Sequence, residues 1–229
     1  MLIAGFPAGA WGTNCYVVAT GQGAECVVVD PGQEAAGTVE QVVRENNLKP
    51  VAVLLTHGHI DHMWSVLPVC GTYDATAYIH PGDRHLLADP MAGISPETAR
   101  MLLGGEHTFA EPDDVAELAD GSSLELAGLT MTVDHTPGHT EGSVTFTMPY
   151  DGPEDVSQVL FSGDVLFAGS IGRTDLPGGD HQVMLHTLAT KILPMDDDIV
   201  VLPGHGGQTT IGREKATNPY LQDLETVDR

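Results

Sequence analysis

The sequence predicts an α/β fold in which two groups of strands are each flanked by helices. Short apolar runs bounded by glycine, proline or acidic residues recur along the chain, and such runs are typical of buried strands. Two other segments carry apolar residues at helical spacing. Strands gathered in two halves with helices beside them indicate two sheets packed face to face, with the helices outside.

Eight apolar runs are the predicted strands. They cover residues 15–19, 26–29, 51–55, 75–79, 129–133, 144–148, 159–161 and 199–202. The first four precede residue 80 and the last four follow residue 128, which divides the strands into two groups. The segment between the groups, residues 93–120, is interrupted by prolines, glycines and acidic residues, and we expect it to cross the surface.

Helices are predicted where apolar residues recur every three or four positions. Residues 34–46 show this spacing through Val39, Val42 and Val43, and residues 181–193 show it with Asp180 placed as an N-cap. Shorter helices are expected near Asp61, at residues 82–88, and at residues 218–224 after a loop that ends at Arg213.

Composition restricts the possible partners. The chain has 229 residues without a long linker, so residues 1–229 are predicted to form a single domain. Its net charge is −23 with nine basic residues, which argues against nucleic acid and anionic membranes. Because the N-terminus lacks a basic signal region and no 18-residue apolar run occurs, we expect a cytoplasmic protein. Cys15, Cys26 and Cys70 are predicted to be reduced and buried.

The strongest functional signal is the run Thr-His-Gly-His-Ile-Asp-His at residues 56–62, directly after a predicted strand. Its candidate metal ligands are His57, His59, Asp61 and His62. Histidines two positions apart cannot share a helix face, so a tight loop at the strand end must present them. Neutral imidazole and carboxylate are the ligands that borderline divalent metals prefer.

Three later loops add further candidates. His139 lies on a glycine-flanked turn, Asp164 ends the strand at 159–161, and His205 follows the last strand beside two glycines. Five imidazoles and two carboxylates exceed the four ligands of a closed zinc site and suit two open sites. The sequence therefore predicts a binuclear centre, in which an aspartate bridges two metals and a shared water becomes the nucleophile. Zinc is the first expectation, with iron or manganese as alternatives.

The succession of His-x-His-x-Asp-His, isolated histidine, aspartate and final histidine resembles the metallo-β-lactamase superfamily over nearly the whole chain. The resemblance implies a four-layer αβ/βα sandwich with the metals at one edge of the paired sheets. It also implies a division of the ligands. His57, His59 and His139 would hold the first metal, Asp61, His62 and His205 the second, and Asp164 would bridge the two.

Residues 161–180, the Pro-Gly-His-Gly loop at 203–206 and Asn218-Pro219 are most similar to glyoxalase II, or hydroxyacylglutathione hydrolase, in a short form without the C-terminal helical domain. This similarity implies hydrolysis of a small-molecule S-2-hydroxyacyl thioester by a metal-bridging hydroxide. Asp61 would help orient the nucleophile. Arg173 is a candidate substrate contact, or else forms a buried ion pair with Asp175 or Asp180.

Other functions remain open at this point. A lactonase of the same superfamily would use the same seven ligands, and the persulfide dioxygenases share the Gly-Arg-Thr-Asp run at 172–175 but hold one iron. A true β-lactamase is disfavoured because Asp164 stands where most zinc β-lactamases place cysteine. A metal-binding protein without turnover is the remaining alternative. The other six histidines are expected to be structural or exposed, with a strand-end hydrogen bond favoured for His135 over a contact with His139.

Overall fold

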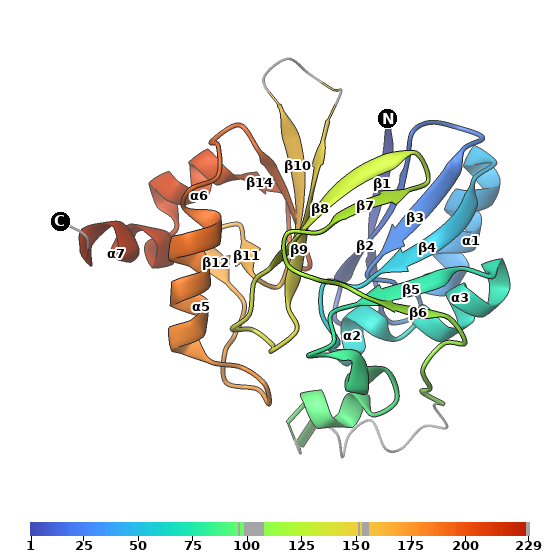
Figure 1. Cartoon of the computed structure of the whole chain (residues 1–229), viewed down its shortest axis with the longest axis horizontal. Coiled ribbons are helices and arrows are strands. Elements are labelled where there is room, and N and C mark those ends of the chain that lie inside the picture. The colour runs from blue at the N-terminus through green and yellow to red at the C-terminus, as the bar shows by residue number, and fades with distance from the viewer. Residues whose placement is uncertain (96, 99–107, 151, 153–155, 228–229) are drawn as a thin grey trace.

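Two six-stranded sheets pack face to face, and helices cover the outer side of each (Figure 1). The computed structural model describes residues 1–229 except 96, 99–107, 151, 153–155 and 228–229. The layers follow one another as helix, sheet, sheet and helix, which confirms the predicted four-layer αβ/βα sandwich.

The first sheet has the strand order β1-β2-β3-β4-β5-β6. Its strands are β1 (Leu2–Ala8), β2 (Thr13–Ala19), β3 (Glu25–Val29), β4 (Lys49–Leu54), β5 (Thr76–Ile79) and β6 (Val115–Glu117). The pairs β1–β2 and β2–β3 are antiparallel, whereas the pairs β3–β4, β4–β5 and β5–β6 are parallel. The carboxyl ends of β3, β4 and β5 therefore lie at one edge of the sheet.

The second sheet has the order β14-β13-β10-β9-β8-β7. Its strands are β7 (Ser123–Leu126), β8 (Leu129–His135), β9 (Val144–Pro149), β10 (Gln158–Gly163), β13 (Val200–Pro203) and β14 (Thr209–Thr210). Because β8 and β10 are both antiparallel to β9, and β13 is parallel to β10, three strands end at the same edge. A small hairpin of β11 (Leu166–Phe167) and β12 (Ser170–Ile171) follows β10.

The helices lie on the outer faces or at the edge where the strands end (Figure 1). They are α1 (Ala35–Asn46), α2 (Ile60–Met63), α3 (Val66–Tyr73), α5 (His181–Thr187), α6 (Ile211–Thr217) and α7 (Pro219–Val227), with short 3₁₀ helices η1 (Arg84–Leu87) and η2 (Pro90–Gly93). A π turn, η3 (Leu188–Ile192), continues α5. Among the described helices, none has the length and apolarity needed to cross a membrane.

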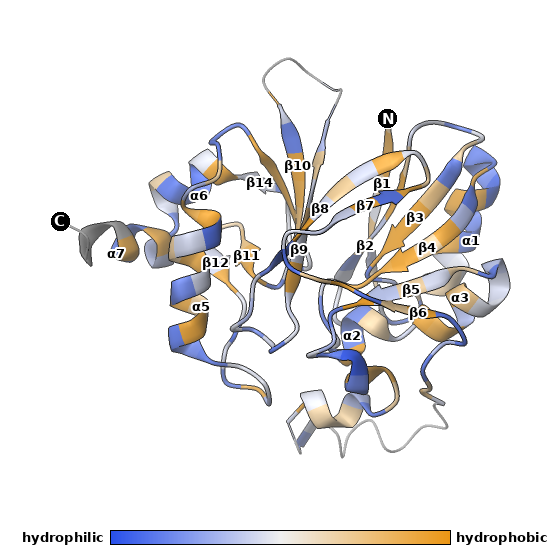
Figure 2. Cartoon of the chain, viewed as in Figure 1, coloured by the Kyte–Doolittle hydropathy of each residue, from blue (hydrophilic) through white to orange (hydrophobic). Residues whose placement is uncertain are grey.

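Apolar side chains fill three interfaces, and the central strands β3 and β4 are coloured largely as hydrophobic (Figure 2). Between the sheets, Phe146, Phe161 and Met131 are almost completely buried. Val39 and Val43 of α1 pack on the first sheet, and residues of α5 to α7 pack on the second. Cys15, Cys26 and Cys70 are free and buried, as predicted.

Most predicted elements are present. All eight strands occur within one or two residues of their predicted bounds, and Asp180 caps α5 by accepting the backbone N–H of Gln182 and Val183. The helix predicted at residues 82–88 is the 3₁₀ helix η1, and the helix predicted at residues 218–224 is α7.

The expected loop ending at Arg213 was wrong, because α6 begins at Ile211, where the Thr210 side chain accepts the Arg213 N–H. The strand β1 was missed because Gly5 and Pro7 interrupt it, although proline is tolerated on an edge strand. The prediction of a surface crossover at residues 93–120 was incomplete, because this segment also contains the strand β6. Residues 96 and 99–107 of the segment lie outside the described residues.

Replacing Phe146 tests the interface between the sheets. Its ring is fully buried, so Phe146→Ala should lower the free energy of unfolding by about 3–5 kcal/mol through lost apolar contact and the resulting cavity. Urea denaturation followed by circular dichroism measures this change. Tyr220→Ala, at a 38% exposed position, is the control and should change stability by less than about 1 kcal/mol. Equal effects of the two substitutions would contradict the assigned core.

Candidate metal centre

The segment after β4 places four of the predicted ligands at the strand-end edge. His57 and His59 lie in the loop, with His59 at the N-cap position of α2, while Asp61 and His62 occupy the first turn of that helix. The three imidazoles are at most 4% exposed. The Asp61 carboxylate stays partly exposed, and the Thr13 hydroxyl donates to its Oδ2 at 2.8 Å.

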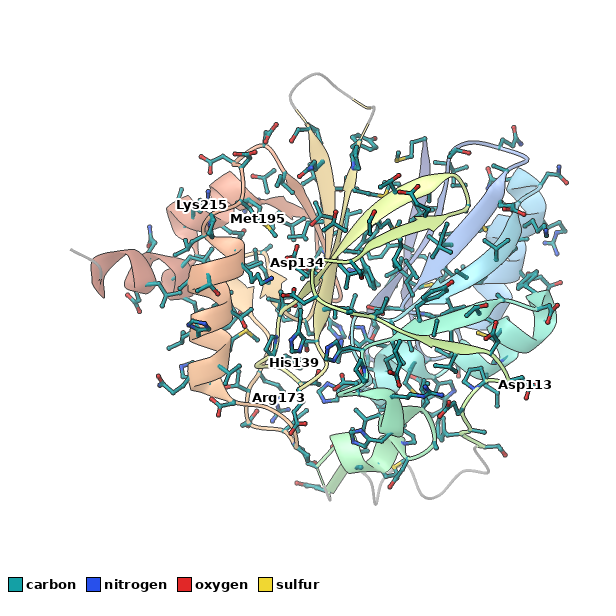
Figure 3. All side chains as sticks on the ribbon, in the orientation of Figure 1. Asp113, Asp134, His139, Arg173, Met195 and Lys215 are labelled. Carbon is teal, nitrogen blue, oxygen red and sulfur yellow. The ribbon has the colours of Figure 1, made fainter. Side chains whose placement is uncertain are left out.

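The second sheet brings the remaining three candidates to the same place. The Nδ1 of His59 lies 2.9 Å from His139 Nε2, and His62 Nε2 lies 3.2 Å from Asp164 Oδ1. His205 Nε2 lies 3.1 Å from Asp61 Oδ2. In the view of Figure 3, His139 is seen below the centre, between the two halves of the molecule. The structure thus gathers all seven sequence-predicted side chains in one cluster.

Potential ligand atoms within this cluster form three overlapping groups. The groups are His57 with His59 and His139, His57 with His62 and Asp164, and Asp61 with His62 and His205. Within each group the ligand atoms are no more than 4.8 Å apart. Asp164 Oδ2 lies 3.6 Å from both His139 Nε2 and His205 Nε2, which places this carboxylate between the first and third groups. The arrangement fits a binuclear metal site.

A buried carboxylate that sequence reasoning missed orients two of the histidines. Asp30 follows β3 and accepts hydrogen bonds from His62 Nδ1 at 2.9 Å, from the Thr56 N–H at 2.8 Å and from the Thr56 hydroxyl at 2.6 Å. Because that hydroxyl proton goes to Asp30, its oxygen is left to accept from His57 Nδ1, 3.1 Å away. Both rings therefore turn their Nε2 atoms inward. A signal was present, since Asp30 directly follows a predicted strand.

His139 is oriented by a backbone carbonyl. Its Nδ1 lies 2.7 Å from the carbonyl oxygen of Arg173, which can only accept, so Nδ1 carries the proton and Nε2 faces the cluster with a lone pair. His135 does not assist, because its Nε2 bonds to the Glu141 carbonyl and its ring stacks on His80. The strand-end role favoured for His135 is thus the one observed.

The loop that carries His205 is held by the first sheet. Asn14 Nδ2 donates to the carbonyl oxygens of Pro203 and Gly206 at 2.9 Å each, and the Tyr16 hydroxyl donates to Pro203 as well. Gly204 has no room for a side chain, since a Cβ there would collide with Asp164 and His62. Glycine is needed at this position because the backbone passes directly against the cluster.

Burial lowers the pKa of His57 and His59, and the neighbouring imidazoles lower it further; the pKa of His59 falls to about 3. Both rings are therefore neutral at pH 7, which is the form that binds metal. Burial also lowers the pKa of His62, but the carboxylates of Asp164, Asp61 and Asp30 outweigh it and raise that pKa above its ordinary value. A cation at this position would take the place of the His62 proton.

Several inward atoms lack any hydrogen-bond partner, and this tests whether metal fits. His57 Nε2, His62 Nε2 and Asp164 Oδ1 are all buried without a well-directed hydrogen bond, although the last two atoms lie 3.2 Å apart. Buried polar atoms are almost always satisfied in proteins, so a cluster of unsatisfied inward atoms requires an explanation. Divalent cations bound by nitrogen and oxygen ligands would satisfy these atoms together. The residues present therefore fit a binuclear metal centre.

A pocket of about 360 Å³ opens onto the cluster. Its walls carry Trp11, Phe167, Leu176 and Arg173 in addition to the metal-binding candidates. The Arg173 guanidinium forms two hydrogen bonds with Asp175, but both side chains are exposed, so the buried ion pair considered for Arg173 was wrong.

Comparison with known proteins gives a consistent picture. The model of the metallo-beta-lactamase superfamily matches residues 8–205. An uncharacterized protein of Mycobacterium tuberculosis is 48% identical, with 98% of this chain and 99% of that protein covered. The hydroxyacylglutathione hydrolase GloC of Haemophilus influenzae is 34% identical, with 94% and 95% covered, and the probable metallo-hydrolase YqgX of Bacillus subtilis is 36% identical, with the same coverage.

Solved structures agree with the sequence relatives. The crystal structure of BLEG-1 B3 metallo-beta-lactamase matches with a TM-score of 0.82 and 41% identity, covering 96% of this chain and 99% of that one. The structure of TTHA1623 in a di-iron-bound form matches with a TM-score of 0.75 and 35% identity, covering 96% and 100%. Together with the fold and the histidine and aspartate cluster, these matches establish that the chain belongs to the metallo-beta-lactamase superfamily.

Proposed function

We propose that this metal-dependent hydrolase cleaves a thioester, with an S-2-hydroxyacyl thiol as the substrate class. The observation that carries the proposal is the seven-residue cluster with its unpartnered inward atoms at the base of a pocket. The thioester assignment is supported by similarity to the hydroxyacylglutathione hydrolase GloC over nearly the full length of both chains.

The ligands would divide between two positions. His57, His59 and His139 form one group, and Asp61, His62 and His205 form the other. Asp164 would bridge them, because its carboxylate lies near members of both groups: Oδ2 is 3.6 Å from His139 of the first group and from His205 of the second, and Oδ1 is 3.2 Å from His62 of the second. Zinc fits the nitrogen-rich ligand set, and the di-iron form of TTHA1623 makes iron the first alternative.

Two bound divalent ions would supply a water deprotonated near neutral pH and a Lewis acid for the carbonyl oxygen. The chain's own groups do the positioning. Thr13 donates to Asp61 Oδ2, and His205 Nε2 lies 3.1 Å from the same oxygen, so this carboxylate is fixed among the ligands and would help orient the nucleophile. Trp11, Phe167 and Leu176 form an apolar wall that limits water around the reacting group.

Arg173 is the proposed substrate contact. Arg173 lines the pocket, and its carbonyl oxygen fixes His139. Because the Arg173–Asp175 pair is exposed, it is weak, and a substrate carboxylate can compete for the guanidinium.

A β-lactamase is a second candidate, because a structure with 41% identity is described as a B3 metallo-beta-lactamase. Hydrolysis of a lactam amide uses the same activated water, so the cluster alone does not separate the two reactions. A persulfide dioxygenase fits less well, since one iron held by two histidines and an aspartate would leave several inward-facing ligands unused.

A substrate panel tests the proposal. The protein is loaded with zinc or iron and assayed with S-lactoylglutathione, a lactoyl thioester of a smaller thiol, a lactone, a cephalosporin and a persulfide. We expect thioester kcat/KM to exceed that for the cephalosporin and the lactone by at least ~100-fold, about 2.7 kcal/mol of transition-state discrimination. Faster lactam cleavage, or oxygen uptake with the persulfide, would contradict the thioester assignment.

Removing the proposed bridge tests the binuclear mechanism. Asp164→Ala should lower kcat by more than the ~10–100-fold typical for loss of an outer-shell partner, because the substitution removes a direct ligand of both positions. Elemental analysis should show fewer than two metals per chain. The matched control is Asp198→Ala, which removes an exposed carboxylate and should leave both values unchanged. An unaltered rate in Asp164→Ala would rule out a bridging role.

A further inference from the structure

One buried carboxylate near the metal centre is neither a predicted ligand nor a partner of an imidazole. Asp83 lies just beyond the carboxyl end of β5, at the same edge as the metal loops, and it is 1% exposed. It belongs to none of the three groups of potential metal ligands. Its side chain therefore has a different use.

The Asp83 carboxylate joins two metal loops that belong to different sheets. Its Oδ2 accepts from the N–H of Gly58, which stands between His57 and His59, at 2.8 Å. The same oxygen accepts from the Thr140 hydroxyl at 2.7 Å, and Oδ1 accepts from the Gly142 N–H at 2.7 Å. Thr140 follows His139 directly in the sequence, and Gly142 comes two positions after Thr140.

The contact is closely packed as well as hydrogen bonded. A Cβ on Gly142 would lie 2.6 Å from both the Asp83 side chain and its backbone nitrogen. A Cβ on Gly82 would lie 3.1 Å from the Gly142 backbone. The Ser143 hydroxyl also contacts Thr140, at 2.7 Å from its Oγ1. The two loops consequently have little freedom to slide past each other while Asp83 is present.

We propose that Asp83 is a positioning residue that sets the distance between the His57–His59 loop and the His139 loop. It thereby controls how tightly the position formed by His57, His59 and His139 binds metal, and it leaves the affinity of the other metal position nearly unchanged. Metal–nitrogen distances tolerate only about ±0.2 Å, so a small shift between the loops weakens binding. The second group has supports that do not involve Asp83: Thr13 binds Asp61, Asn14 supports the His205 loop, and Asp30, which also aims His57 through Thr56, binds His62. The inference rests on the two-metal centre of the proposed function.

The test is Asp83→Asn, compared with Asp113→Asn, which makes the same change of charge at an exposed position. The asparagine has about the same size, but its NH₂ group must face an N–H or O–H donor, so at least one inter-loop hydrogen bond is lost. Zinc is titrated into the metal-free, full-length proteins by calorimetry with a competing chelator. We expect one of the two binding events to weaken by ~10–100-fold in Asp83→Asn and the other to stay within threefold of wild type.

A second pair of variants tests whether a smaller loss of hydrogen bonding weakens zinc binding to a smaller extent. It also provides a test if Asp83→Asn does not fold. Thr140→Val removes one of the three hydrogen bonds and should weaken the same binding event to a smaller extent, whereas Thr140→Ser keeps the hydroxyl and should restore it. Unfolding midpoints measured without metal monitor general destabilisation. Equal weakening of both binding events, or unchanged affinities in both Asp83→Asn and Thr140→Val, would overturn the proposal.

The outcome is independent of the substrate. Selective loss of one zinc in a protein that cleaves no thioester would support the role of Asp83 and reject the thioester assignment. Unchanged zinc affinities in Asp83→Asn and Thr140→Val, in a protein that does cleave thioesters, would support the thioester assignment and reject the role of Asp83.

Discussion

The structure around the metal centre depends on the buried carboxylate of Asp30, at the point where β3 ends. Its backbone adopts a left-handed conformation (φ 47°), which is unfavourable for a non-glycine residue. Three hydrogen bonds offset that cost, and they join the end of β3 to the loop after β4. Through them one carboxylate aims His62 directly and His57 by way of Thr56. The remaining cluster residues are arranged around these two rings.

The topology of the sheets makes such an arrangement possible. Parallel pairing sends the ends of β3, β4 and β5 to one edge, and the alternation of β8, β9 and β10 sends β8, β10 and β13 to the same edge of the other sheet. Six strand-end loops therefore meet across the seam of the sandwich. Hydrogen bonds that Asp83 accepts, and hydrogen bonds that Asn14 and Tyr16 of β2 donate, then join segments that belong to different sheets. Rigid strands on both sides allow widely separated segments to supply one site.

The sequence predicted the candidate metal ligands more completely than the residues that hold those ligands in place, for a physical reason. Imidazoles crowded at strand ends favour a metal site, so His57 can be recognised within its own loop, and His205 can be recognised together with the other candidate loops. Asp30 and Asp83 are ordinary turn residues in the sequence, and only tertiary contacts show what they bind. The same limit applies to the elements: β1 contains Gly5 and Pro7, and only its pairing with β2 makes it a strand.

The metal chemistry and the choice of substrate are located in different parts of the chain. The ligands lie on loops fixed by strands and buried hydrogen bonds, whereas the pocket wall comes from the hairpin between β1 and β2, the hairpin of β11 and β12, and the segment around η2. Trp11 is 37% exposed on the first hairpin, and Phe167 stands on the second. Under the proposed function, two bound metals would activate any carbonyl placed over them, so discrimination between substrates would come from what these walls admit. Substitutions in the two hairpins would then change the substrate while leaving the seven candidate ligands in place.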